Sequence, residues 1–277
     1  MNEARANTLI TVDELAQLID DQAAVVLLDV IDEQGSAPEG RPKIPGSLSA
    51  HLATDFSGTP TAASGRRPLP GLPELEATAR AWGICNDSAV VVYDNSGGAQ
   101  ASRAWWTLRW AGLSNVRLLD GGYGAWVASN RPSSSDVATS ATCAGDVVLR
   151  AGCMPTIDAE EAARLAKQSR LLDARPRASY LGDPAKAGTG HIPGAVHAPA
   201  GDNIADGKFK PGDALHARYS RLGAHTSSPI GVYCGSGNAA AHAIAAMSAA
   251  GLAAALYVGS WSEWSADPSR PVATGPT

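Results

Sequence analysis

The strongest constraint on this chain is that its sequence is written twice. Four segments of the first half return in the second half, in the same order and about 140 residues later. The pairs are VVLLDV with RLLDAR, KIPGSLSAHL with HIPGAVHAPA, VVVYDNSGGAQASRAWWTLRWAGL with IGVYCGSGNAAAHAIAAMSAAGL, and LLDGGYGAW with LYVGSWSEW. This repetition predicts two copies of one domain, at residues 1–130 and 153–277, joined by a linker over residues 131–152.

Each copy alternates between helical and strand patterns. In the first copy, apolar residues at helical spacing follow Thr11, which together with Glu14 matches a helix capping box. The next run, VVLLD, is short and continuously apolar, as expected for a strand buried on both faces. PELEATARAWGI is again helical, and AVVVYD is again a buried strand. The alternation predicts an α/β fold in which each domain has a parallel sheet with helices on both faces.

Charge and hydropathy exclude several classes of function. The net charge is -5, and no run of basic residues exceeds Arg66–Arg67, so we expect no nucleic-acid partner. Residues 239–258 carry no Asp, Glu, Lys or Arg over a length that could cross a bilayer. The matching segment of the first copy contains Arg103 and Arg109. We therefore expect a helix packed on the protein surface, followed by a strand, and no membrane segment.

Cysteine usage bears on compartment and metal binding. The chain has four cysteines, which are widely spaced and form no C-x-x-C pair, at Cys85, Cys143, Cys153 and Cys234. This spacing argues against a zinc site and is typical of a reducing compartment. The N-terminal residues lack the apolar core of a secretory signal. We expect a cytoplasmic protein without a metal or organic cofactor. We also expect a monomer, because a covalent tandem supplies its own domain interface.

Cys234 differs from the other cysteines in its surroundings. It follows a predicted strand over residues 230–233 and precedes a predicted helix, so it lies in a strand-to-helix loop with Gly235 and Gly237. Glycines allow successive N–H groups to converge into an anion-binding nest, and the N-terminus of a helix adds partial positive charge. Both effects stabilise a thiolate, the reactive form of cysteine. The pattern favours a nucleophile. We expect the other three cysteines to be buried packing residues, with an exposed linker thiol as the alternative for Cys143.

Taken together, these motifs resemble the rhodanese family of sulfurtransferases. The segments DAR, GHIPGA, YCGSG and GSWSEWSADPSRPV carry the resemblance, which covers nearly the whole chain. It implies two tandem rhodanese-like domains, in which Cys234 takes sulfur from a small-molecule donor as a persulfide. The outer sulfur then passes to a thiol or cyanide acceptor, with thioredoxin and glutathione among the compatible ones. Asp94 occupies the cysteine position in the first copy, so we expect the N-terminal domain to be catalytically silent.

The resemblance also bears on the sulfur donor. In the family, a CGSG loop accompanies 3-mercaptopyruvate, and a basic pair after the cysteine accompanies thiosulfate. The expected active-site loop is made of Cys234, Gly235, Ser236, Gly237, Asn238 and Ala239. Its neutral composition favours 3-mercaptopyruvate, with thiosulfate:cyanide sulfur transfer by the same mechanism as the alternative.

Expectations for the donor-binding residues come from departures from the family pattern. The family arginine that binds the substrate carboxylate is replaced here by Ser179. Arg177 or Lys186 is therefore the expected donor-binding residue. Lys43 stands where the first copy of the family often has a histidine that assists proton transfer, and Asp32 is the expected acidic companion.

Two other classes compete with this interpretation. A cysteine phosphatase of similar fold needs an arginine six residues after the cysteine, to bind phosphate with two hydrogen bonds. That position is Ala240, so the phosphatase hypothesis fails. A non-catalytic sulfur-carrier or partner-binding module is the remaining alternative, and persulfide formation on the purified protein would separate it from the enzyme.

Overall fold

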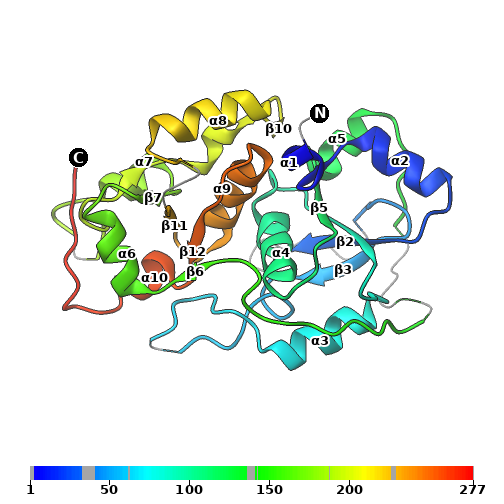
Figure 1. The fold of residues 1–277 in the computed structure, drawn as a ribbon, viewed down its shortest axis with the longest axis horizontal. Coiled ribbons are helices and arrows are strands. Elements are labelled where there is room, and N and C mark those ends of the chain that lie inside the picture. Colours follow the sequence, from blue (N-terminus) through cyan, green and yellow to red (C-terminus); the bar gives the residue numbers. More distant parts are fainter. Residues whose placement is uncertain are drawn as a thin grey trace.

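The computed structural model describes residues 3–32, 41–61, 63–135, 141, 143–186, 188–225 and 229–276. These residues form two α/β domains placed side by side, with the N-terminal domain on the right and the C-terminal domain on the left in Figure 1. Each domain contains a five-stranded sheet in which every pair of neighbouring strands is parallel. The predicted fold class is confirmed.

The sheet of the N-terminal domain has the strand order β1-β5-β4-β2-β3. Its strands are β1 (Leu9–Ile10), β2 (Val25–Ile31), β3 (Leu48–His51), β4 (Ala89–Tyr93) and β5 (Val116–Leu119). Its helices are α1 (Glu3–Ala6), α2 (Val12–Asp20), α3 (Leu72–Ala81), α4 (Ala99–Trp110) and α5 (Gly122–Ala128).

The sheet of the C-terminal domain has the equivalent order, β6-β12-β11-β7-β8. Its strands are β6 (Thr156–Ile157), β7 (Leu171–Asp173), β8 (Val196–His197), β11 (Gly231–Tyr233) and β12 (Ala255–Tyr257). Its helices are α6 (Ala159–Ala166), α7 (Arg177–Leu181), α8 (Gly212–Arg221), α9 (Asn238–Ala249) and α10 (Ser260–Trp264). A short hairpin of β9 (Ile204–Ala205) and β10 (Lys208–Phe209) is added beside a 3-10 turn at Ala200–Asn203.

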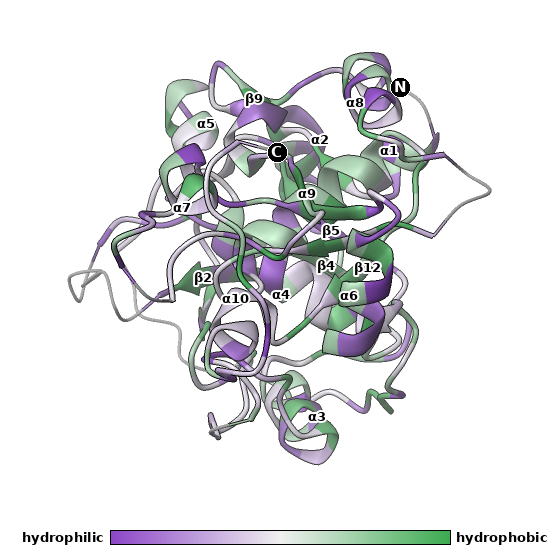
Figure 2. Cartoon of the chain, turned by 90° about the vertical axis from the view of Figure 1, so that its left-hand side faces the viewer, coloured by the Kyte–Doolittle hydropathy of each residue, from purple (hydrophilic) through white to green (hydrophobic). Residues whose placement is uncertain are grey.

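Local sequence explains why these elements form where they do. At the start of α2, the N–H of Glu14 donates to the Thr11 hydroxyl at 3.2 Å, and the Thr11 N–H donates to the Glu14 carboxylate at 2.9 Å. This is the predicted capping box. The apolar runs of β4 and β11 are buried between helical layers, and the hydrophobic strands lie inside the fold in Figure 2.

The two copies repeat one another down to single hydrogen bonds. The hydroxyl of Tyr93, at the end of β4, accepts from the N–H of Ile44 at 3.2 Å. The hydroxyl of Tyr233, at the end of β11, accepts from the N–H of Ile192 at the same distance. In both copies the bond ties the Ile-Pro-Gly turn to the central strand. The residue after each tyrosine, Asp94 or Cys234, therefore begins an equivalent loop.

The domains share a core through α4 and α9, which lie side by side at the centre of the molecule (Figure 1). One continuous cluster of buried apolar side chains includes Leu28 and Trp105 of the first domain and Leu172 and Ile244 of the second. An interface built as a shared core does not allow the two domains to move freely.

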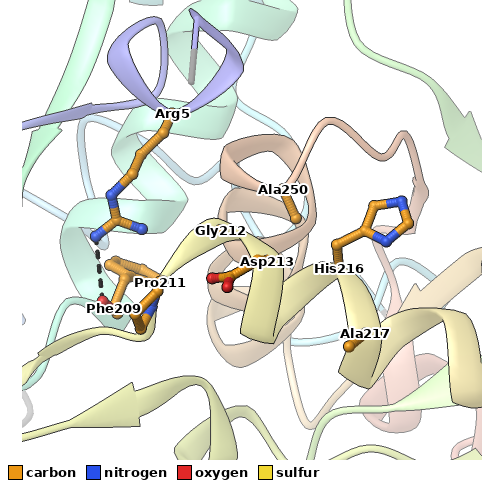
Figure 3. A pocket seen from close by; sticks show the side chains of 8 residues that line it. All are labelled: Arg5, Phe209, Pro211, Gly212, Asp213, His216, Ala217 and Ala250. Carbon is orange, nitrogen blue, oxygen red and sulfur yellow. Dashed lines mark hydrogen bonds between the residues drawn. The ribbon is translucent and has the colours of Figure 1, made fainter. Parts of the chain in front are cut away.

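Arg5 of α1 makes polar contacts with both domains at one end of this interface. Its guanidinium pairs with Asp120 at 2.7 Å and donates to the carbonyls of Phe209 and Lys210. A surface pocket opens beside it, lined also by Gly212, Asp213, His216 and Ala250 (Figure 3). Ala250 marks the C-terminal end of α9, so this pocket lies a helix length away from the Cys234 loop.

The segment between the domains packs against the first domain. Helix α5 ends at Ala128 and β6 begins at Thr156, so the expected linker of residues 131–152 falls between them. The N–H of Val147 donates to the carbonyl of Ile84 at 3.2 Å, and the N–H of Arg150 donates to that of Ala111 at 2.9 Å. These bonds fix the described part of the linker to the N-terminal domain.

The alanine-rich segment forms α9 and then β12, so the predicted helix followed by a strand is present. The expected position of the helix on the protein surface is wrong, because most residues of α9 are buried against α4 in the shared core. Within the described ranges, no helix combines the length and the apolar character needed to span a bilayer.

Candidate active site

Cys234 lies where β11 gives way to α9. Gly237 is the N-cap of α9, and its φ of 100° is a left-handed conformation that glycine adopts without strain. This turn directs the Gly237 N–H at the sulfur, with N and Sγ 3.0 Å apart. An N–H directed at sulfur, at the N-terminus of a helix, stabilises a thiolate more than a thiol. The predicted N–H contact to the sulfur at a helix N-terminus is present, and the role of Cys234 as a nucleophile stays a prediction.

The loop is held from behind by the start of α10. The hydroxyl of Ser260 accepts from the N–H of Cys234 at 3.2 Å. The N–H of Trp261 donates to the Cys234 carbonyl at 2.9 Å, and the N–H of Ser262 donates to the carbonyl of Gly235 at 3.0 Å. Residues 260–262 of the GSWSEW motif therefore hold the backbone of the Cys234 loop in position.

The front of the loop is covered by the N-terminal domain. Arg103 of α4 is completely buried, and its Nη1 lies 2.7 Å from the point where a Cβ on Gly237 would stand. Its Nη2 donates to the carbonyl of Arg67 at 3.1 Å. Burial lowers the pKa of Arg103 to about 10, against an opposing effect of nearby Cys234, so the guanidinium stays protonated at neutral pH.

A second contact comes from the segment at residues 65–67, which we call the arginine strap. The N–H of Arg66 donates to the Ser262 hydroxyl at 3.0 Å, and its Nη2 lies 3.4 Å from the position of a Cβ on Gly235. The guanidinium of Arg67 binds both oxygens of Asp32, at 2.8 and 3.0 Å. The loop itself is neutral, but the first domain brings cations to it.

The arginine strap and α4 leave Cys234 only 3% exposed. The cysteine lies at the domain boundary, where side chains of the first domain cover it. Of the residues that cover it, Arg66 is exposed, whereas Arg103 is buried.

The equivalent loop of the first domain is occupied by a carboxylate. Asp94 is buried, and its two oxygens accept hydrogen bonds of 2.8 to 3.0 Å from four backbone N–H groups, those of Ser96, Gly98, Gln100 and Ala101. The N–H groups of this loop are thus taken up by a carboxylate in the first domain. That the first domain is catalytically silent stays a prediction.

The remaining residues expected at the site lie in several places. Ser236 and Asn238 belong to the loop and the first turn of α9, with Ala239 next in the helix. Lys43 is buried, pairs through its backbone with Ser134, and has its Nζ 3.5 Å from the Ser49 hydroxyl.

Arg177 begins α7 and is exposed, and the Nζ of Lys186 lies 3.7 Å from Asp183 on the surface. The contacts to the Cys234 loop are made instead by Arg66 and Arg103. Asp32, expected beside Lys43, has Arg67 as its partner.

The arginine of the DAR motif has a structural role. Arg175 is buried, with its Nε 2.9 Å from Oδ1 of Asp173, and its guanidinium lies over the ring of Trp261 at 4.5 Å. Arg175 therefore links β7 to α10 through its contacts with Asp173 and Trp261. Within the described residues, no group of three His, Cys, Asp or Glu side chains is arranged to hold a metal ion.

Comparison with known proteins agrees with this site. The family model of the rhodanese-like domain matches residues 11–129 and 158–267. The chain belongs to the rhodanese family. It is 42% identical to the SseB protein of Mycobacterium tuberculosis, named as a thiosulfate sulfurtransferase, over 99% of both chains. It is 42% identical to a Pseudomonas aeruginosa protein named as a 3-mercaptopyruvate sulfurtransferase, over 84% of both chains.

The crystal structure of the 3-mercaptopyruvate sulfurtransferase SseA from Escherichia coli is similar as well. It superposes with a TM-score of 0.78 at 25% identity, covering 92% of this chain and 99% of that one. The expected tandem of two rhodanese-like domains and the sulfurtransferase class are therefore confirmed, and the protein is a sulfurtransferase.

Proposed function

We propose that this rhodanese-family protein transfers sulfane sulfur from 3-mercaptopyruvate to a thiophilic acceptor through a persulfide on Cys234. The observation that carries the proposal is the Gly237 N–H directed at the sulfur, 3.0 Å away, beside the buried cation of Arg103. This environment favours sulfur as an anion, which is the form that attacks a donor.

The proposed reaction has two steps. The Cys234 thiolate attacks the sulfur of 3-mercaptopyruvate, the C–S bond breaks, and its electron pair leaves on carbon. That carbon takes the proton of the 3-mercaptopyruvate thiol group. The products are pyruvate and a persulfide on Cys234. The thiolate of the acceptor, or cyanide, then attacks the outer sulfur and releases the Cys234 thiolate.

The first domain supports a location for the outer sulfur. In Asp94, the carboxylate oxygens stand two bonds beyond Cβ, as the outer sulfur does in a cysteine persulfide. Those oxygens accept from the N–H groups of Gln100 and Ala101, the second and third residues of α4. The equivalent donors on α9 are the N–H groups of Ala239 and Ala240. We propose that they hold the outer sulfur of the persulfide.

The donor carboxylate requires a cation, and the contacts favour Arg66. Its guanidinium reaches the Cys234 loop and is exposed, so it can bind a ligand without leaving a buried charge unpaired. The sequence-based hypothesis that Arg177 or Lys186 performs this role stays a prediction. The same cations also favour thiosulfate, a dianion, and this keeps thiosulfate:cyanide transfer as the second candidate.

The proposal is tested by mass and by kinetics. Treatment with 3-mercaptopyruvate should add the mass of one sulfur atom to the wild type and none to Cys234→Ser. Steady-state assays with cyanide should then give a higher kcat/KM for 3-mercaptopyruvate than for thiosulfate. A higher value for thiosulfate would select the second candidate, and no adduct with either donor would point to a non-catalytic module. Acceptors such as thioredoxin and glutathione, a monomeric state and a cytoplasmic location stay predictions.

A further inference from the structure

Arg103 is an unusual residue for the interior of a protein. It is 0% exposed, and neither its Nε nor its Nη1 has a hydrogen-bond partner among the described residues. Its one hydrogen bond is made by Nη2 to the Arg67 carbonyl. A buried cation is costly unless an opposite charge or a set of hydrogen bonds compensates it. Among the described residues, one hydrogen bond and a cation–π contact with Trp106, 6.0 Å from the ring centroid, stabilise this guanidinium, and neither supplies an opposite charge.

Among the residues that the structure describes, one candidate anion acts on Arg103. The ionisable groups that act on it are Cys234, which favours its charge, and Arg67, which opposes it. Arg67 is itself paired with Asp32, so that carboxylate is already neutralised. The Nη1 atom meets the second domain at Gly237, the residue whose N–H donates to the sulfur of Cys234. The anion able to complete this arrangement is the cysteine sulfur.

We infer that Arg103 is the counter-ion of the thiolate and persulfide on Cys234, supplied to the cysteine loop by the domain in which Asp94 stands at the cysteine position. The role is a positioning and electrostatic one, and it rests on the proposed function for the persulfide. It also gives the silent domain a part in the reaction, because the charge that the second domain needs comes from α4.

The reciprocal contact supports this inference. His242 is the fifth residue of α9, as Arg103 is the fifth residue of α4, and its ring lies 3.6 Å from the position of a Cβ on Gly98 in the other loop. Asp94 in that loop is satisfied by four N–H groups, whereas the sulfur of Cys234 accepts a hydrogen bond from Gly237. The residue facing the satisfied carboxylate is a neutral histidine, and the residue facing the sulfur is a cation.

Other charges around the cysteine loop act from further out. Arg66 approaches it at Gly235 but is exposed, and water screens its charge. Glu263 of α10 lies beside Gly259 and is paired with Arg270. Arg103 is therefore the buried cation expected to have the largest effect on the sulfur.

The test uses the pH dependence of alkylation at Cys234, which requires no sulfur donor. Iodoacetamide would be reacted with the full-length protein over a range of pH, and modification of the Cys234 peptide followed by mass spectrometry. Arg103→Met removes the charge, Arg103→Lys keeps it, and Arg109→Met is the matched control. Arg109 lies on the same helix and over Trp105, away from the loop.

Arg103→Met removes a positive charge close to the sulfur. The midpoint of its alkylation profile should therefore move upward by about 1 to 3 pH units. Arg103→Lys should stay close to the wild type, and so should Arg109→Met. An unchanged midpoint in Arg103→Met, or equal shifts in the Met and Lys variants, would overturn the inference. If Arg103→Met does not fold, Arg103→Lys decides alone, because a lysine profile displaced by more than about one unit contradicts a charge-based role.

The outcome is separable from that of the proposed function. If the wild type forms no persulfide but the Met profile shifts, sulfur transfer fails while the counter-ion stands for the thiolate. If the persulfide forms and the profile does not move, only the inference about Arg103 is lost.

Discussion

Arg103 and His242 occupy the same position of α4 and α9, the fifth residue of each helix, and each faces the loop of the opposite domain. Arg103 meets the Cys234 loop at Gly237, and His242 meets the Asp94 loop at Gly98. Each helix thus places one side chain against a loop of the opposite domain. The Cys234 loop is therefore in contact with a side chain of the opposite domain.

Burial of His242 should make the protein sensitive to acid. Burial lowers the pKa of His242 to about 4 from an ordinary value of 6.5, against the opposing effect of Asp94. As pH falls through 6.5, the unfolded chain takes up this proton before the folded protein does. The contribution of neutral His242 to the free energy of unfolding is therefore fully present above pH 6.5. It is lost as pH falls towards 4, by about 3 kcal/mol at most.

Urea unfolding at pH 7 and pH 4.5 measures this loss. His242→Gln removes the titrating group, so the difference in unfolding free energy between the two pH values should be smaller in the variant. Identical differences in the variant and the wild type would show that the acid sensitivity arises elsewhere.

Replacement of Asp94 should destabilise the first domain strongly. Asp94→Ala leaves four backbone N–H groups at the start of α4 without their acceptor, and we expect a loss of about 2 to 4 kcal/mol in unfolding free energy. The control is Asp158→Ala, since Asp158 also caps a helix but is exposed and accepts from Glu161 alone. Its expected cost is about 1 kcal/mol. Chemical denaturation should separate the two variants, and equal costs would contradict the nest.

A side chain at Gly237 should damage both folding and chemistry. Gly237→Ala combines a left-handed φ with a Cβ only 2.7 Å from Nη1 of Arg103. Gly46→Ala is the matched control, because Gly46 has a φ of 78° and open space at its Cβ position. The control should lose about 1 kcal/mol through backbone conformation alone. Gly237→Ala should lose more and form less persulfide by intact mass; a cost equal to the control would argue against the Arg103 contact.

The arginine strap should control the use of anionic donors. A charge-assisted contact to the donor is worth about 1.5–3 kcal/mol, so Arg66→Ala should lower kcat/KM by about one to two decades. Arg164→Ala, an exposed arginine paired with Glu161 in α6, should behave as wild type. The same assay on Arg177→Ala and Lys186→Ala tests the sequence-based hypothesis. A larger effect in either of them than in Arg66→Ala would return the donor site to the second domain.

The sequence predicts the architecture because the information for it is local and duplicated. Helical spacing after Thr11, the buried run ending at Asp29 and the loop around Cys234 each depend on neighbours along the chain. The same reasoning places Asp94 opposite Cys234 in the repeat. These features depend on the period of apolar residues and on glycine positions, both of which are visible without coordinates.

The residues that the sequence did not reveal act across the domain boundary. Arg103 looks like a surface charge in a repeat analysis, yet it is buried against the other domain. Arg66 and Arg67 appear as an ordinary basic pair, and only the packing of the domains brings them to the cysteine loop. One signal was available. Position five of each repeated helix carries an ionisable side chain, and Arg103 and His242 are these residues.

The pairing of α4 with α9 has also made the two halves unequal in size. At position eight of the two helices stand Trp106 and Ala245, both fully buried. Two copies of α4 would bring bulky indoles into the same space, and two copies of α9 would leave a void, and both overpacking and cavities are destabilising. The two helices therefore differ in side-chain volume at the shared core, and each domain packs against a surface unlike its own.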